Sequence, residues 1–314
     1  MADRSNKSRL RAWLELLRAP NLLTAPGDPL AGFLLACAGA WGGAPTDWPS
    51  RPVLRAAMAG AVSLLLYTAG LLWNDWFDLR DDLRERPSRP LPSGRVRPGT
   101  VAAVANGCML LAVVVAAVAG RPMLYAAVAL GAAVLLYDSF LKRLRVVGPL
   151  AMGLCRGLSV LVGAAAVGWD GPAQPVVLAA AGGMMLYVAA VTNLARGETQ
   201  RQRVRPKAML VFAATGAYLL ALSLSAGWSM HSWRGWMTAA GIAALLWVAG
   251  CLWRMGHEPE PPEVQRAVGA LLRVLILLQA TACLLAGAVG AYVAAGLAAA
   301  FVASTVLGRR FHGS

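Results

Sequence analysis

Charged residues are scarce in this sequence, and acidic residues are fewer than basic ones. Only 14% of the 314 residues are charged, against about 25% in ordinary globular domains. Just 15 residues are Asp or Glu, and 58% are hydrophobic. This composition excludes a soluble globular chain and predicts an all-α polytopic membrane protein.

Cysteine and histidine are also scarce, with five and three residues. None of them has the spacing of a metal site. The cysteines lie in apolar segments, where we expect them to pack against neighbouring helices: Cys37, Cys108, Cys155, Cys251 and Cys283. The first apolar segment has no small-residue cleavage site behind it, so no signal peptide is predicted.

Ten apolar stretches use almost the whole chain. A membrane span needs about 20 apolar residues. We expect spans near residues 22–40, 53–73, 101–119, 122–138, 147–168, 174–193, 207–227, 232–253, 265–286 and 289–307. No soluble domain of any size fits between them, so residues 1–314 are predicted to form a single transmembrane domain.

Lys and Arg are unevenly distributed between these stretches. They gather at both termini and after every even-numbered stretch, whereas the other connections hold only Arg51, Arg55, Arg121 and Arg234. This alternation follows the positive-inside rule, and it predicts an even number of spans with both termini in the cytoplasm. Residues 1–18 read as a basic, amphipathic cytoplasmic lead on the inner leaflet. Because the net charge of +14 is placed in this alternating way, it does not indicate a nucleic-acid partner. We expect the protein in the inner membrane of a bacterium.

One dense group of acids follows the second stretch. Asn74, Asp78 and Asp82 are spaced by four residues, and Asp75 lies one turn before Asp78. If the helix continues through them, they share a face and can aim their oxygens at one point. Clustered carboxylates repel one another unless a cation holds them, and hard oxygen ligands suit Mg²⁺. The alternative is a solvated helix end without a ligand.

The motif Asn-Asp-x-x-Asp-x-x-x-Asp, followed by Arg-Pro-x-Arg-Pro-Leu-Pro-Ser-Gly, resembles the first signature of the UbiA superfamily of intramembrane prenyltransferases. In that family the acids hold Mg²⁺ on an isoprenyl diphosphate. The resemblance implies that the acids here are metal ligands and catalytic, with the amide beside them as a further ligand: Asp75, Asp78, Asp82 and Asn74. Arg86 and Arg89 would bind the diphosphate, as guanidinium groups do well.

The resemblance covers roughly residues 10–286 and implies a bundle of nine spans around a central cavity, here with a tenth span at the C-terminus. Residues 74–100 and 194–207 would be cytoplasmic active-site loops. The end of the fourth stretch fits the same pattern, because Lys142 and Arg143 would bind diphosphate and Tyr137 would lie near the reacting allylic carbon. The alternative for these three is an aromatic belt residue followed by positive-inside charges.

Arg156, Asn21 and Asp28 are polar residues within or at the start of apolar stretches. Arg156, about ten residues into the fifth, needs a partner, either an anion in the cavity or an acid, unless it snorkels to the interface. We assign it to diphosphate binding. Asn21 and Asp28 are candidates for lining the cavity; Asn21 fits a helix cap equally well, and two prolines beside Asp28 favour a bent helix. The runs around these residues, Arg18–Phe33 and Gly148–Leu158, resemble the EboC-like branch of the superfamily.

The second acidic motif of the superfamily is degenerate here. Glu198 can replace its last acid as a metal ligand, Asn193 stands near the first as a cavity-lining candidate, and Arg196 occupies a position where relatives carry an acid. We assign Arg196 to binding of the diphosphate. Because the motif keeps only one acid, whether it binds a second Mg²⁺ is left open.

These observations predict Mg²⁺-dependent transfer of a prenyl group from an isoprenyl diphosphate to an acceptor within the lipid bilayer, through an allylic carbocation. The acceptor and the oligomeric state cannot be read from the sequence. Two alternatives are a non-catalytic carrier of a lipid phosphate, favoured by the degenerate second motif, and a solute transporter. A transporter does not explain acids at the cytoplasmic mouth, since transporter sites lie near the midplane.

Overall fold

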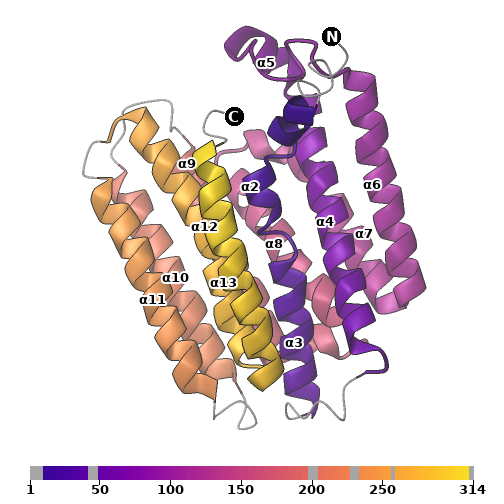
Figure 1. Cartoon of the computed structure of the whole chain (residues 1–314), viewed down its shortest axis with the longest axis vertical. Helices are drawn as coiled ribbons and strands as arrows, with labels where there is room; N and C mark the ends of the chain where they lie inside the picture. The colour runs from indigo at the N-terminus through magenta and orange to yellow at the C-terminus, as the bar shows by residue number, and fades with distance from the viewer. Residues whose placement is uncertain (1–9, 42–48, 197–203, 227–232, 256–258, 311–314) are drawn as a thin grey trace.

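The structure, a computed structural model, describes residues 10–41, 49–196, 204–226, 233–255 and 259–310. Within these residues the secondary structure is entirely helical (Figure 1). The long helices are α4 (Pro52–Phe77), α6 (Pro98–Ala119), α7 (Arg121–Ser139), α8 (Val147–Ala165), α9 (Pro175–Ala195), α10 (Arg205–Ser225), α11 (Arg234–Arg254), α12 (Pro261–Leu284) and α13 (Gly287–Arg310). The shorter ones are α2 (Ala19–Leu22), α3 (Gly27–Trp41), α5 (Leu79–Glu85), η2 (Leu141–Arg143) and η3 (Gly171–Ala173).

The expected polytopic membrane fold is confirmed. Nine of the described helices, from α4 to α13 without α5, are long and apolar enough to cross a membrane. The C-terminal tenth stretch is among them, as α13. The first stretch is the exception, because its apolar helical part, Gly27–Gly39, is shorter than a full span.

Proline explains why the first stretch is broken. Helix α2 ends at Leu22, a turn follows, and α3 begins at Gly27 with Pro26 just before it and Pro29 just inside it. A proline at position 26 disfavours helical geometry at the preceding residue, so the two helices cannot join. The break leaves the carbonyl oxygen of Thr24 without a helical donor, and side chains from α8 and α12 bond to it instead.

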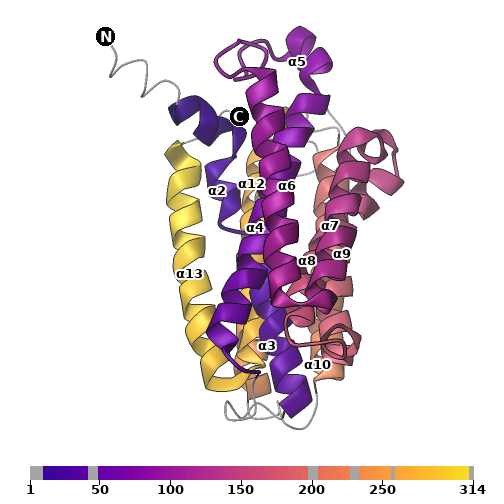
Figure 2. The same cartoon turned by 90° about the vertical axis from the view of Figure 1, so that its right-hand side faces the viewer.

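Helix α8 is central to the bundle, because it packs against α3, α7 and α9 (Figures 1 and 2). Small residues bring its backbone close to α3. A Cβ atom at Gly163 would overlap the carbonyl of Pro29, and one at Gly32 would overlap the carbonyl of Val160. Close approach through small residues is the usual way in which membrane helices gain packing energy.

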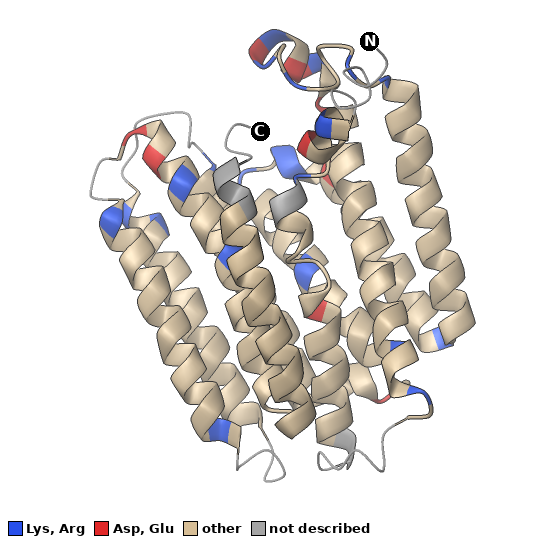
Figure 3. Cartoon of the chain, in the orientation of Figure 1, with Lys and Arg blue, Asp and Glu red and all other residues tan. Residues whose placement is uncertain are grey.

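Most of the charged residues that Figure 3 colours lie toward one end of the bundle. That end carries α5, the helix of residues 10–16 and the C-terminal end of α13 (Figure 1). The two ends of the described chain therefore lie on the same side, as an even number of crossings requires. The site described below is at this charged end.

Candidate active site

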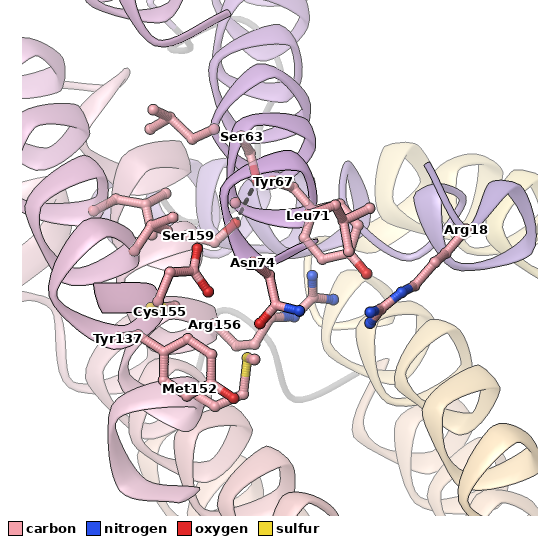
Figure 4. Close-up of a pocket in the computed structure, with 15 residues that line it drawn as sticks. Arg18, Ser63, Tyr67, Leu71, Asn74, Tyr137, Met152, Cys155, Arg156 and Ser159 are labelled. Atoms are coloured by element: carbon pink, nitrogen blue, oxygen red, sulfur yellow. Dashed lines mark hydrogen bonds between the residues drawn. The ribbon is translucent and has the colours of Figure 1, made fainter. Parts of the chain in front are cut away.

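A cavity of about 290 Å³ lies between α4, α7 and α8 (Figure 4). Its walls are largely apolar, with Leu66, Leu71, Leu130, Val134 and Met152 among the lining residues. Its polar lining comes from several elements, namely Arg18, Asn74, Tyr137, Asp138 and Arg156, with a hydrogen-bonded pair formed by Ser63 and Ser159. The cavity therefore combines a hydrocarbon-compatible wall with charged groups.

The helix that carries the acidic motif does not continue straight through it. Helix α4 ends at Phe77, Asp78 is the residue between the helices, and α5 begins at Leu79. The predicted single face of Asn74, Asp78 and Asp82 is therefore wrong in its geometry. The break sorts the oxygens into two sets, each of which faces one basic side chain.

Arg89 faces the first set. Its Nη1 lies 2.8 Å from Oδ2 of Asp82 and 3.9 Å from Oδ1 of Asp75. Asp75 also receives a contact of 3.4 Å from Nη2 of Arg18. Both carboxylates are buried, so these cations compensate charges that would otherwise be costly to bury. The loop after α5 thus brings Arg89 onto the acids.

Lys142 faces the second set. Its Nζ lies 2.6 Å from Oδ1 of Asp78 and donates to Oδ1 of Asn74 at 3.3 Å. Helix α7 ends at Ser139 and η2 follows it, which carries the Lys142 ammonium across to the end of α4. The structure therefore brings together the first motif and the basic residue after the fourth span, which are far apart in the sequence.

Asn74, Asp75, Asp78 and Asp82 form, with Arg89 and Lys142, what we call the rim of the site. The oxygen ligands of the rim fit Mg²⁺. Two carboxylates share one guanidinium, and a carboxylate and an amide share one ammonium, so each set of hard oxygens already surrounds a positive charge. Among the described residues, no three His, Cys, Asp or Glu side chains are close enough to hold one ion. A metal held here would rely on a pair of carboxylates, the amide and its substrate, as Mg²⁺ commonly does.

Arg156 lines the cavity, and the carboxylate of Asp28 compensates its positive charge. Its Nε lies 2.9 Å from Oδ2 of Asp28, its Nη2 donates to the carbonyl of Thr24 at 2.9 Å, and its guanidinium stacks over the ring of Tyr67 at 5.7 Å. Asp28 is fully buried and also accepts a 2.6 Å hydrogen bond from Gln279. Of the partners expected for Arg156, the structure supplies the acid. Asp28 itself lies behind Arg156 and is not one of the residues that line the cavity.

Several predicted residues are not in the cavity lining. Arg86 is exposed, and Arg143 forms only a 3.9 Å surface pair with Asp81. Arg196 donates to the backbone carbonyls of Lys142, Leu144 and Arg145, so it fixes the connection after η2. Asn21 and Asn193 are half-buried at other points of the bundle. Glu198 lies outside the described residues, and its role stays a prediction.

Sequence reasoning missed Arg18 and Asp138. Arg18 was counted only as part of the basic lead, but it lines the cavity and contacts Asp75. Its φ of 45° is left-handed, which is uncommon for a residue other than glycine and often marks a functional position. Asp138 stands directly after Tyr137, and its position beside a motif residue was the available signal.

The N-terminal helix of residues 10–16 packs on the rim of the site. Ala12 and Leu16 are buried against Leu91 and Val96 of the proline-rich loop. Glu15 forms a 2.8 Å ion pair with Arg95 of the same loop. Part of the lead therefore packs on protein, whereas Leu10 on the same helix is exposed. That the lead lies along the inner leaflet stays a prediction.

Comparison with known proteins places the chain in one family and finds relatives of one kind. Residues 30–276 match the UbiA prenyltransferase family. A digeranylgeranylglyceryl phosphate synthase of Ignicoccus hospitalis is 29% identical over 266 residues, covering 78% of this chain and 82% of that protein. One of Methanopyrus kandleri is 33% identical over 156 residues, which are 50% of this chain and only 53% of that protein.

Solved structures share the fold. One of a digeranylgeranylglyceryl phosphate synthase covers 87% of this chain and 97% of its own, with a TM-score of 0.57 and 17% identity. One of a UbiA homologue from Archaeoglobus fulgidus, bound to DMAPP and Mg²⁺, covers 85% of this chain and 98% of its own, with a TM-score of 0.52 and 14% identity. With the family match over most of its length and this shared fold, the chain belongs to the UbiA prenyltransferase family.

Proposed function

We propose that this protein transfers a prenyl group from an isoprenyl diphosphate to an acceptor inside the membrane, in a Mg²⁺-dependent reaction through an allylic carbocation. One observation carries the proposal: a largely apolar cavity borders a rim of acids and bases, which Asn74 and Arg18 of the cavity lining contact. The rim suits a diphosphate and the wall suits a hydrocarbon tail. A prenyl diphosphate combines both chemistries in one molecule.

The rim residues bind the diphosphate. Asp75, Asp78 and Asp82, with Asn74, would hold Mg²⁺, which would neutralise phosphate charge and supply Lewis-acid chemistry. Arg89 and Lys142 stand within 4 Å of these acids, so they also face a diphosphate bound there. Arg18 supplies a further charge at the same rim.

The same cations favour departure of the diphosphate. Negative charge grows on the leaving group as the C–O bond breaks, and cations fixed in a low-dielectric site stabilise that charge more than they stabilise the ground state. The allylic cation then lies beneath the rim, beside Tyr137 and the apolar wall, where water is scarce. Arg156 is partly compensated by Asp28, so we give it a smaller share of the diphosphate charge than the rim residues have.

Three finer inferences concern the acceptor, the branch of the family and the membrane. The names of the relatives make a glyceryl phosphate the first acceptor to test. The EboC-like branch is supported by the two runs that resemble it, Arg18–Phe33 and Gly148–Leu158. A bacterial inner membrane with cytoplasmic termini is supported by the alternation of basic loops and by the charged end of the bundle.

The proposal is tested with purified protein in lipid nanodiscs and radiolabelled geranyl diphosphate, by measuring diphosphate release and prenyl product across a Mg²⁺ series. We expect Asp78→Asn and Asp82→Asn each to lower the rate by about 10²–10³-fold, as loss of a group that stabilises developing charge does. Asp81→Asn is the matched control, because its side chain is 67% exposed and lies in the same segment. Donor binding and Mg²⁺ dependence that survive both substitutions would refute the metal assignment.

The same assay separates an enzyme from a carrier of lipid phosphates. A carrier binds the donor in the presence of Mg²⁺ but releases no diphosphate with any acceptor. An enzyme releases diphosphate and forms a prenylated product in equal amounts.

A further inference from the structure

Asp138 is a buried acid that the reaction described above does not use. It is 2% exposed and lines the cavity. Its Oδ2 has no hydrogen-bond partner among the described residues. A buried carboxylate without a partner is costly, and native proteins keep one where a ligand or the chemistry needs it. The three acids of the first motif differ from it, because each has a basic partner.

Asp138 lies deeper in the cavity than the diphosphate rim. A Cβ atom at Gly70 of α4 would stand 3.9 Å from its Oδ2. Gly70 precedes Asn74 by one helical turn, and α4 runs toward the charged end. The carboxylate therefore lies beside Gly70, which is one helical turn below Asn74. A diphosphate at the rim places the reacting carbon of its chain near this depth.

The charges around Asp138 come from several elements. Lys142 of η2 and Arg18 are the positive groups near it, Asp78 and Asp75 are the negative ones, and Cys155 faces it from α8. Lys142 and Arg18 are already in contact with rim acids. Asp138 is therefore the carboxylate of the cavity that remains available to a second substrate.

We propose that Asp138 is a further catalytic residue: its carboxylate accepts a hydrogen bond from a hydroxyl group of the acceptor and removes the proton as that oxygen bonds to the prenyl chain. This inference rests on the proposed function. An ionised carboxylate repels an anionic nucleophile and accepts a hydrogen bond from an O–H group. The apolar side chains around it suit an acceptor with a hydrocarbon body.

The step balances as follows. The bond between C1 of the prenyl chain and the diphosphate oxygen breaks, and its electron pair leaves with the diphosphate. A lone pair of the acceptor oxygen forms the new bond to C1. The proton of the acceptor hydroxyl passes to Oδ2 of Asp138 and later leaves to solvent.

The test compares wild-type protein with Asp138→Asn, Asp138→Glu and, as a control for loss of an acid, Asp170→Asn, which is exposed in the connection before η3. Each is given Mg²⁺, radiolabelled geranyl diphosphate and 1-O-octadecylglycerol as a hydroxyl acceptor, with water as a second acceptor that is always present. Donor binding, diphosphate release and the alkali-stable ether or prenol are measured separately.

We expect Asp138→Asn to bind the donor as the wild-type protein does and to lose transfer by about 10²–10⁴-fold, the range for loss of a general base. Asp138→Glu should recover at least a tenth of the lost rate, and Asp170→Asn should match the wild type. The inference is overturned if Asp138→Asn transfers within tenfold of the wild type, or if it loses donor binding to the same extent as transfer. If Asp138→Asn does not fold, Asp138→Glu is judged by the same split between binding and transfer.

Failure of the proposed function gives a different result. In that case the wild-type protein itself releases no diphosphate with any acceptor, and both proposals fall together. Failure of this inference alone leaves wild-type transfer intact.

Discussion

The ion pair between Asp28 and Arg156 gives the sharpest prediction about stability. Asp28 is 0% exposed and Arg156 is 6% exposed, and their charged atoms are 2.9 Å apart. Removing one partner leaves the other charge buried and uncompensated, which costs about 3–5 kcal/mol. We therefore expect Asp28→Asn and Arg156→Met each to lower the free energy of unfolding by that amount.

The double variant tests the reason. Asp28→Asn with Arg156→Met removes both charges, and the carbonyl of Thr24 keeps its hydrogen bond from Gln279. Replacing a whole buried pair is often close to neutral, so the double variant should be no less stable than either single one. Independent effects would instead add to about 6–10 kcal/mol.

The assay is equilibrium unfolding of the purified protein in mixed micelles, followed by helical circular dichroism. Asp170→Asn, exposed at the opposite end, is the control and should change stability by no more than about 0.5 kcal/mol. Additive losses in the double variant would show that the two charges do not depend on each other. That result would refute the pairing as the reason why a charge is tolerated inside the membrane.

Two further substitutions test the rim and the packing. Lys142→Met should raise the KM for geranyl diphosphate by about 10–100-fold, as loss of a supporting contact at a metal site does. The control Arg143→Met should change the KM little, because the side chain of Arg143 is 67% exposed. Equal effects of the two substitutions would show that Lys142 does not bind the diphosphate. Gly163→Ala should lower the free energy of unfolding by about 1–3 kcal/mol, because its Cβ would overlap a carbonyl of α3. The control Gly182→Ala meets no atom within 4 Å and should be neutral or stabilising in the same unfolding assay. Equal losses in the two variants would show that α3 and α8 do not pack this closely.

The helices and their orientation followed from local features of the sequence. Apolar length predicts a span because an unsatisfied backbone group in lipid is costly, and the placement of Lys and Arg predicts the side. The first motif was also readable, since its acids lie within nine residues. Each of these signals acts over one helix or one loop, so the rest of the fold does not change it.

The partners of the charged residues were decided by the tertiary structure. Arg156 and Asp28 are 128 positions apart, and Lys142 and Asp78 are 64 positions apart. A helix places side chains only three or four residues apart on one face, so no spacing rule predicts such pairs. The break at Asp78 likewise divided acids that a continuous helix would have aligned.

The amino-acid sequence by itself determined that this is a polytopic membrane protein with an acidic motif and basic connections between its spans. Only the packing of α4, α7 and α8 decided which cation faces which acid, and that Oδ2 of Asp138 has no hydrogen-bond partner among the described residues. The physical reason is that hydrophobicity is a property of each segment, whereas the compensation of a buried charge depends on what the rest of the chain brings within about 4 Å of it.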